Sequence, residues 1–328
     1  MTNPTTNVDD AIGLAAAIKG WPKSRRIRWR AESGGEETLS VSNHAGPART
    51  AFVFAGGGSF GAIQVGMMHS LAAHGISADM VVGSSVGALN GAYYAGDPTL
   101  KGVLQLETIW RGLQRHDVFP VTWRTLLAFL WRRDFLIPHD GIQKLIDDHL
   151  PYRNLQDAKL PVHIVTTDIV SGDSIVLSEG SAAQAIIAST AIPGAFAPIR
   201  YKELYLADGA ISSNTPIRVA VAKGARRLII LPTGYACSTN KPPVGAVANA
   251  LHALTLLIAR QLVGELEDLA PGIEYCVVPP LCPLVGSPYD FTRTSDHIER
   301  AIASTDAWLA QNGLEQGGIP EEMRPHSH

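Results

Sequence analysis

The feature that most constrains the fold is a regular alternation of short apolar runs with helix-like segments. Residues 51–55 (AFVFA) have the length of a buried strand, and residues 61–74 follow with a helical pattern that ends at Gly75. A second apolar run over residues 80–82 precedes a second helical stretch over residues 86–95. Strands that alternate with helices in this way predict an α/β fold, with a mostly parallel central sheet covered on both faces.

The rest of the chain continues this alternation less regularly. Residues 100–150 read as helices and loops only. Further strands are expected at 162–167, 174–177, 204–206, 228–231 and 275–278, and further helices at 181–189, 216–223, 244–269 and 295–309. We predict one α/β domain over residues 50–315, an N-terminal extension over residues 1–49 that is partly disordered or helical, and a disordered tail over residues 316–328.

The composition is that of a soluble globular protein, since 46% of the 328 residues are hydrophobic and 17% are charged. The net charge of −3 gives no general attraction for nucleic acid, and we expect no nucleic-acid partner. The first ten residues lack the basic start and apolar run of a secretory signal, so we expect a cytoplasmic location. Cys237, Cys276 and Cys282 show neither a disulfide framework nor a metal-binding spacing, and no metal or cofactor is expected.

Three segments bear on membrane contact. Residues 244–259 carry no charge, but they are fewer than the roughly 18 apolar residues of a membrane span and include polar Asn249 and His252, which favours a buried or interface helix. Residues 123–135 combine apolar and arginine side chains, as either an interfacial lid or a helix packed on the core would. The basic cluster at 23–30 is either a solvated face or a contact for anionic lipid. Peripheral membrane contact is therefore left open.

The most specific chemical signal is a G-x-S-x-G match centred on Ser85, with Gly83 and Gly87 on either side. A tight strand-to-helix turn forces the central serine into a strained conformation and exposes its hydroxyl. Side chains two residues before or after the serine would collide with the turn, so glycine is needed there. An apolar strand precedes the match and an alanine-rich helix follows it, which is the context of a nucleophile elbow.

A glycine-rich loop, residues 56–61 (GGGSFG), joins the preceding strand to its helix. Consecutive glycines allow the N–H groups of Gly56, Gly57 and Gly58 to turn outward together and bind an oxyanion. The loop also spells the G-x-G-x-x-G dinucleotide fingerprint. That fingerprint requires an acid at the end of the second strand, whereas Asp79 stands at its beginning, so a dinucleotide site is disfavoured.

Asp208 follows a short apolar strand and begins the sequence D-G-A, with Asn214 and Pro216 a few residues later. An aspartate followed by glycine at the end of a strand is often only a turn residue. Because the serine elbow and the glycine loop occur in the same sequence, Asp208 becomes a candidate base.

The glycine loop, the G-x-S-x-G elbow and the D-G-A with its following N-x-P occur in the order that resembles the patatin-like phospholipase family, of the bacterial type. Residues 188–198 (ASTAIPGAFAP) are similar to the family's A-S-x-A-I-P-x-x-F-x-P segment, and residues 167–180 resemble the hairpin that precedes it. The resemblance covers about residues 51–220.

This resemblance implies a three-layer α/β/α fold and a Ser–Asp dyad without histidine. Ser85 would attack an ester carbonyl, Asp208 would take its proton, and the backbone of residues 56–58 would bind the oxyanion. Water would then release the acyl-enzyme. The implied substrates are lipid acyl esters, including phospholipids, lysophospholipids and acylglycerols.

One departure from the family pattern is Phe60, which occupies the place of a usual Arg or Lys in the glycine loop. It motivates one alternative, a catalytically weak lipid-binding pseudoenzyme. A second alternative is an α/β-hydrolase esterase in which His252 or His297 completes a triad with Ser85 and Asp208. Against the second alternative, only one helix separates the glycine loop from the elbow.

Overall fold

A mixed sheet forms the centre of the computed structural model, which describes residues 29–31, 49–119, 137–234, 246–284, 286–320 and 323. Its strands are β1 (Trp29–Ala31), β2 (Thr50–Phe54), β3 (Met80–Ser84), β4 (Val162–Asp168), β5 (Ser174–Leu177), β6 (Ile199–Tyr201), β7 (Leu204–Asp208), β8 (Arg227–Leu231) and β9 (Glu274–Val277). They are ordered β1-β5-β4-β3-β2-β8-β9, and the β6–β7 hairpin joins the sheet where β7 pairs with β4.

Along the sequence, the helices of the described residues alternate with these strands and follow the last of them. They are α2 (Gly61–Ala73), α3 (Val86–Gly96), α4 (Leu100–Gly112), α5 (Arg115–Val118), α7 (Asp140–His149), α8 (Ala182–Ser189), α9 (Ala210–Ser213), α10 (Ile217–Ala222), α11 (Ala246–Glu267) and α12 (Thr294–Ala310), with 3-10 turns η1 (Gly58–Phe60) and η2 (Leu155–Asp157). Strands β4, β3, β2, β8 and β9 are parallel neighbours. β5 runs antiparallel to β4 because only a short loop joins them.

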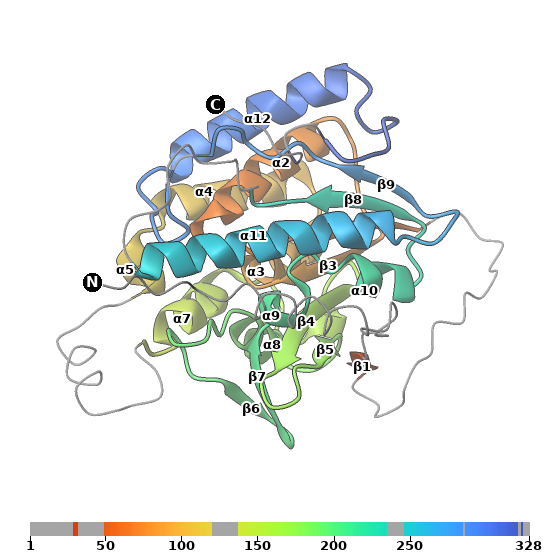
Figure 1. Cartoon of the computed structure of the whole chain (residues 1–328). Helices are drawn as coiled ribbons and strands as arrows, with labels where there is room; N and C mark the ends of the chain where they lie inside the picture. The colour runs from red at the N-terminus through yellow and green to blue at the C-terminus, as the bar shows by residue number, and fades with distance from the viewer. Residues whose placement is uncertain are drawn as a thin grey trace, which may run out of the picture.

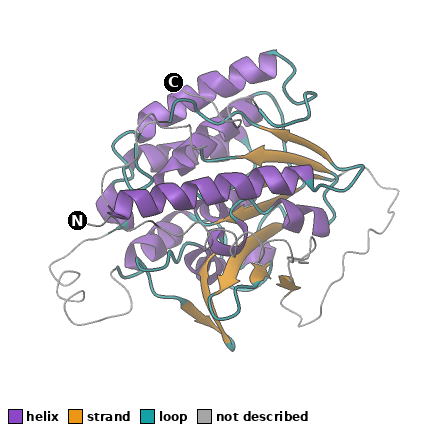
Figure 2. Ribbon diagram, in the orientation of Figure 1, coloured by secondary structure: helices purple, strands orange, loops and turns teal. Residues whose placement is uncertain are grey.

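Helices cover both faces of the sheet, because successive strand residues point in opposite directions. Phe52 and Phe54 of β2 belong to a larger buried cluster that includes residues of α2, α3, α4, α8 and α12. Ala51 and Val53 of the same strand belong to a smaller cluster with α10 and α11. Figure 1 and Figure 2 show α11 crossing in front of the sheet. Helices α2, α4 and α12 are grouped together on the other face of the sheet. The predicted three-layer α/β/α fold with a mostly parallel sheet is confirmed.

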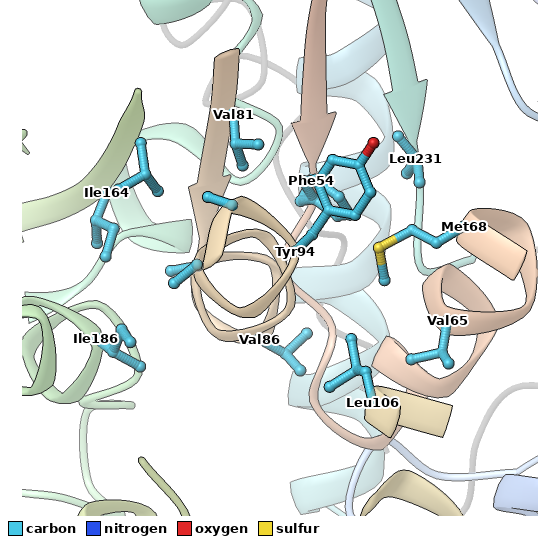
Figure 3. Close-up of a cluster of buried hydrophobic side chains, with 14 of the residues drawn as sticks. Phe54, Val65, Met68, Val81, Val86, Tyr94, Leu106, Ile164, Ile186 and Leu231 are labelled. Atoms are coloured by element: carbon cyan, nitrogen blue, oxygen red, sulfur yellow. The ribbon is translucent and has the colours of Figure 1, made fainter. Parts of the chain in front are cut away.

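The larger cluster surrounds the two strands that lead to the glycine loop and the elbow. Figure 3 shows Phe54, Val81 and Tyr94 from β2, β3 and α3 within this cluster, with Met68 from α2. The rings of Phe52 and Tyr94 are stacked, with centroids 5.3 Å apart. This packing fixes the ends of β2 and β3, where the chemistry predicted from the sequence is located.

Several sequence predictions concern the ends of the chain. Residues 29–31, within the predicted N-terminal extension, form β1 and pair in parallel with β5. In the predicted tail, Gly318 bridges to Cys276 of β9, and Met323 is buried in the smaller cluster because apolar side chains are available to cover it. These residues therefore contact the domain, while the exact domain limits stay a prediction.

The segments considered for membrane contact fall largely outside the described residues. Residues 123–135 lie outside them, as does the basic cluster at 23–30 apart from its part in β1. The uncharged stretch at 244–259 enters α11 at Ala246. None of the helices in the described ranges combines the length and the apolar content that a membrane span requires.

Candidate active site

The elbow residue Ser85 lies between β3 and α3. Its backbone has φ 54° and ψ −127°, a conformation that residues other than glycine rarely adopt. Such a conformation costs on the order of 1–3 kcal/mol and must be held by its surroundings. A methyl group on Gly83 would overlap the Gly87 carbonyl, and one on Gly87 would overlap the carbonyls of Phe54 and Ala55. The close approach of these backbones explains both glycines of the pattern.

A second serine supports the elbow from α8. The Ser85 N–H donates to Ser189 Oγ (2.9 Å), and the Ser189 hydroxyl donates to the Val165 carbonyl of β4 (2.6 Å). All of these atoms are buried. Sequence reasoning assigned Ser189 no role of its own, although it lies in the A-S-x-A-I-P-like segment at 188–198.

The structure brings Asp208, at the end of β7, into direct contact with Ser85. The Ser85 hydroxyl donates to Asp208 Oδ2 at 2.7 Å, and the Ala210 N–H donates to Asp208 Oδ1 at 2.8 Å. The residue Asp208 is only 3% exposed. Burial raises the pKa of Asp208 to about 6, against the two hydrogen bonds, which lower it. The carboxyl group beside the serine hydroxyl therefore changes its protonation state at a higher pH than an ordinary aspartate does.

The backbone of Asp208 is fixed on two sides. Its N–H donates to the Ala191 carbonyl (3.0 Å), and its carbonyl accepts from Thr167 Oγ1 (2.9 Å). The hydroxyl groups of Thr167 and Ser212, in α9, also lie within hydrogen-bond distance (2.9 Å). The hairpin strand β4 and the segment after α8 therefore both position the aspartate, which gives the family-like segments at 167–180 and 188–198 a physical role.

The glycine loop lies beside the serine. A methyl group on Gly56 would come within 3.0 Å of Ser85 Cβ, so only glycine permits this approach. The Gly56 N–H donates to the Asn214 carbonyl (3.0 Å), and the Gly56 carbonyl accepts from Thr233 Oγ1 (2.6 Å). Among the hydrogen bonds of the described residues, none is donated by the N–H of Gly57 or Gly58. The two later glycines of the loop are therefore its available donors.

Phe60 and one of the two candidate histidines, His297, lie on the α12 side of this loop. The rings of Phe60 and His297 meet edge to face, with centroids 5.7 Å apart, and His297 is buried. Within the described residues, no hydrogen bond joins a histidine to Ser85 or Asp208. The side chain of His252 lies outside the described residues. Phe60 thus fills the usual place of a cation with an aromatic contact.

A loop from the C-terminal part of the chain, residues 286–291, completes the surroundings. The Ser59 N–H donates to the Pro288 carbonyl (2.8 Å), and Ser59 Oγ donates to the Ser287 carbonyl (3.1 Å). Burial, and secondarily the charge of Asp208, raises the pKa of Tyr289. The Tyr289 ring also contacts Phe119 edge to face, at 5.6 Å. Sequence reasoning missed this loop, since no motif marks it.

Further aromatic side chains pack beside Tyr289 and Phe119. The Phe119 ring lies 5.7 Å from Phe196 and 6.3 Å from Phe291, and Phe291 stacks on Trp110 at 6.3 Å. These residues come from four separate stretches of the chain. We refer to Phe119, Phe196, Tyr289 and Phe291 below as the aromatic wall. In the part of the chain that the structure describes, no group of His, Cys, Asp and Glu side chains is arranged to hold a metal ion.

Comparisons with known proteins agree with these observations. The chain is 28% identical over 291 residues to patatin-like phospholipase domain-containing protein 7 of Rattus norvegicus, covering 81% of this chain and 21% of that protein. It is 27% identical over 192 residues to the lysophospholipase NTE1 of Scheffersomyces stipitis, covering 56% of this chain and 12% of that protein. The chain thus spans less than a quarter of the length of these relatives.

Among solved structures, VipD from Legionella pneumophila is similar over 90% of this chain and 73% of that chain, with 15% identity and a TM-score of 0.44. The model of the patatin-like phospholipase domain matches residues 52–221, which is more than half of the chain. That range contains the glycine loop, Ser85 and Asp208, and on this match the chain belongs to the patatin-like phospholipase family.

Proposed function

We propose that this chain is a serine acyl hydrolase that cleaves lipid acyl esters through a dyad of Ser85 and Asp208. The observation that carries the proposal is the 2.7 Å hydrogen bond between Ser85 Oγ and a buried Asp208 carboxylate, at a strained strand-to-helix turn. Family membership supports ester hydrolysis as the reaction class. No cofactor or metal takes part in the steps that follow.

In the first half of the reaction, Asp208 removes the hydroxyl proton as Ser85 Oγ bonds to the ester carbonyl carbon. The carbonyl oxygen takes the negative charge. Collapse of this intermediate breaks the ester C–O bond, and the departing alcohol receives the proton from Asp208. In the second half, Asp208 takes a proton from water, whose oxygen attacks the acyl-enzyme. The carboxylic acid leaves, and Ser85 recovers its proton.

The oxyanion donors in this proposal are the N–H groups of Gly57 and Gly58, because the Gly56 N–H already binds the Asn214 carbonyl. Helix α3 begins directly after Ser85, and its N-terminal dipole favours negative charge at the same place. Loss of one such donor typically costs about 10²–10³ in rate. A carboxylate is a weaker base than imidazole, so these donors carry much of the stabilisation.

The substrate class is a lipid acyl ester. We infer that an acyl chain packs against Tyr289, the one half-buried ring of the aromatic wall, whose other three rings are buried in the core. One relative of this chain is named a lysophospholipase, which supports phospholipids and lysophospholipids as the first esters to test. Peripheral contact with a lipid surface remains part of this proposal.

The test uses the full chain, a panel of phospholipid, lysophospholipid and acylglycerol esters, and a fluorophosphonate probe. Wild-type protein should release fatty acid from at least one lipid and should be labelled by the probe at Ser85. Ser85→Ala should lose labelling, and its turnover should fall by several orders of magnitude, with an unchanged circular dichroism spectrum. An unlabelled wild-type protein would favour the pseudoenzyme. Equal turnover by Ser85→Ala would remove the serine from the mechanism.

A further inference from the structure

A chain of three buried polar side chains runs beneath the glycine loop. Gln64 of α2 and Asn90 of α3 are fully buried, and Trp110 of α4 is 2% exposed. Buried amides are costly unless they are hydrogen-bonded, so their partners have to be identified. None of the three residues takes part in the proposed chemistry.

The chain of contacts holds both ends of the loop. Gln64 Nε2 donates to the Ala55 carbonyl (2.8 Å), directly before Gly56, and to the Leu231 carbonyl at the end of β8 (2.9 Å). Asn90 Nδ2 donates to the carbonyl of Gly61 (3.0 Å), directly after Phe60. The two amides are joined by a second bond from Asn90 Nδ2 to Gln64 Oε1 (2.9 Å).

Trp110 sets the orientation of both amides. An indole N–H can only donate, and Trp110 Nε1 donates to Asn90 Oδ1 (2.9 Å). This bond fixes the oxygen of Asn90 toward Trp110 and its nitrogen toward Gln64. The oxygen of Gln64 must then face Asn90, which leaves both of its N–H groups for the carbonyls of Ala55 and Leu231. Each bond of the chain therefore depends on the one before it.

Trp110 also limits the loop sterically. A methyl group on Gly61 would come within 2.8 Å of the Trp110 ring, so the indole lies directly against the start of α2. The other face of the site holds the loop through the Pro288 carbonyl and Thr233. The loop is thus held from below by a network with every polar side-chain atom paired, and such networks rigidify what they contact.

We propose that Gln64, Asn90 and Trp110 are positioning residues that hold the glycine loop with the Gly57 and Gly58 N–H groups aimed at the reacting carbonyl oxygen. This inference rests on the proposed function for its effect on rate, but its effect on loop order can be measured without turnover. The network supplies from within the fold an ordering of the loop that Phe60, which has no charge, does not supply.

Two variants break the network at different points. Trp110→Phe removes the N–H that orients Asn90 and keeps a ring beside Gly61, while Gln64→Met keeps length without donors. A matched control is Tyr152→Phe, because the Tyr152 hydroxyl donates to the Ala92 carbonyl (2.8 Å) further along the same helix α3 and away from the loop. All three variants lose one or more buried hydrogen bonds, so Tyr152→Phe controls for the general loss of stability that the other two variants also suffer.

The first measurement is turnover per active site, with sites counted by fluorophosphonate titration. Trp110→Phe and Gln64→Met should lower kcat by about tenfold or more with little change in KM, since oxyanion binding acts mainly on the transition state. Tyr152→Phe should stay within about twofold of wild type. If all three variants lower the melting temperature equally but keep per-site kcat, the network is only structural and the inference is wrong.

The second measurement is amide hydrogen exchange of a peptide spanning residues 55–61, compared with a peptide from the elbow. Trp110→Phe should speed exchange in the loop peptide by about threefold or more and leave the elbow peptide unchanged, which Tyr152→Phe should not do. This result is expected whether or not the wild-type chain hydrolyses the esters tested. Unchanged loop exchange in both network variants would overturn the inference, whereas an inactive wild type would overturn only the proposed function.

Discussion

The elbow and the glycine loop are both strand-to-helix turns at the ends of neighbouring strands, but they are held in different ways. The elbow is shaped by Gly83 and Gly87, two residues either side of Ser85, with one distant support from Ser189. The glycine loop depends on residues far along the chain, including Asn214, Thr233 and Pro288. A reactive side chain needs one strained residue, whereas a row of backbone donors needs its whole segment to be fixed from outside.

The largest effect should come from Asp208→Asn, which removes the proposed proton acceptor beside Ser85. We expect activity to fall by about 10³-fold or more, because the dyad members act together. The free energy of unfolding of this variant, in contrast, should not fall. The pKa of Asp208 in the folded protein, about 6, lies above its ordinary value, so ionising the buried group destabilises the fold as pH rises from about 4 through 6.

The melting temperature of Asp208→Asn at pH 8 should therefore equal or exceed that of wild type. The gain in the free energy of unfolding should not exceed roughly 1–3 kcal/mol. Ester hydrolysis and thermal denaturation at that pH check both effects. His297→Ala serves as the comparison and should retain most of its activity. A folded His297→Ala protein as inactive as Asp208→Asn would instead support the histidine triad.

Gly87→Ala tests the local control of the elbow. The added methyl would overlap backbone carbonyls of Phe54 and Ala55, which cannot shift without moving β2. We expect a loss of roughly 1–3 kcal/mol in the free energy of unfolding and a fall in activity of about 100-fold. The control is Gly112→Ala at the end of α4, where a methyl group would meet no atom within 4 Å. That variant should be neutral or slightly stabilising.

Smaller losses of activity should come from removing one supporting hydrogen bond of each turn, Ser189 at the elbow and Thr233 at the glycine loop. Ser189→Ala removes the acceptor of the Ser85 N–H and a donor to the Val165 carbonyl, and Thr233→Val removes one donor to the Gly56 carbonyl. Each should cost about 1–2 kcal/mol of stability. We expect about a tenfold loss of kcat in each case, measured per titrated site. If only Ser189→Ala lowers kcat, the glycine loop is held well enough by its remaining contacts.

The smallest effect concerns pH. Because the proposed reaction needs the ionised Asp208 and burial raises the pKa of this group to about 6, kcat/KM should be half-maximal near pH 6 and level above about pH 7. Activity at pH 5 should be about a tenth of the plateau. A profile measured with a neutral ester between pH 4.5 and 8.5 checks this. A rate that is flat down to pH 4.5 would contradict the raised pKa.

Much of the fold could be predicted from the sequence, because its signals are local. The apolar runs at 51–55 and 80–82 became β2 and β3, and the helix expected at 295–309 became α12. The expected strand at 275–278 became β9, shifted by one residue. The pairing of residues 29–31 with β5 was not predicted, since three residues carry too little pattern to mark a strand.

The sequence by itself determined the sharp turn at Ser85 with Gly83 and Gly87, because such a turn imposes its residue types within five positions. It also pointed to Asp208 through the order of the motifs. Only the tertiary structure decided that the Gly56 N–H binds the Asn214 carbonyl, that the Tyr289 ring contacts Phe119, and that Gln64, Asn90 and Trp110 form one network. The physical reason is distance along the chain. The bond from Gln64 to the Leu231 carbonyl joins residues 167 positions apart, and a backbone carbonyl accepts a hydrogen bond whatever its side chain, so no residue pattern records it.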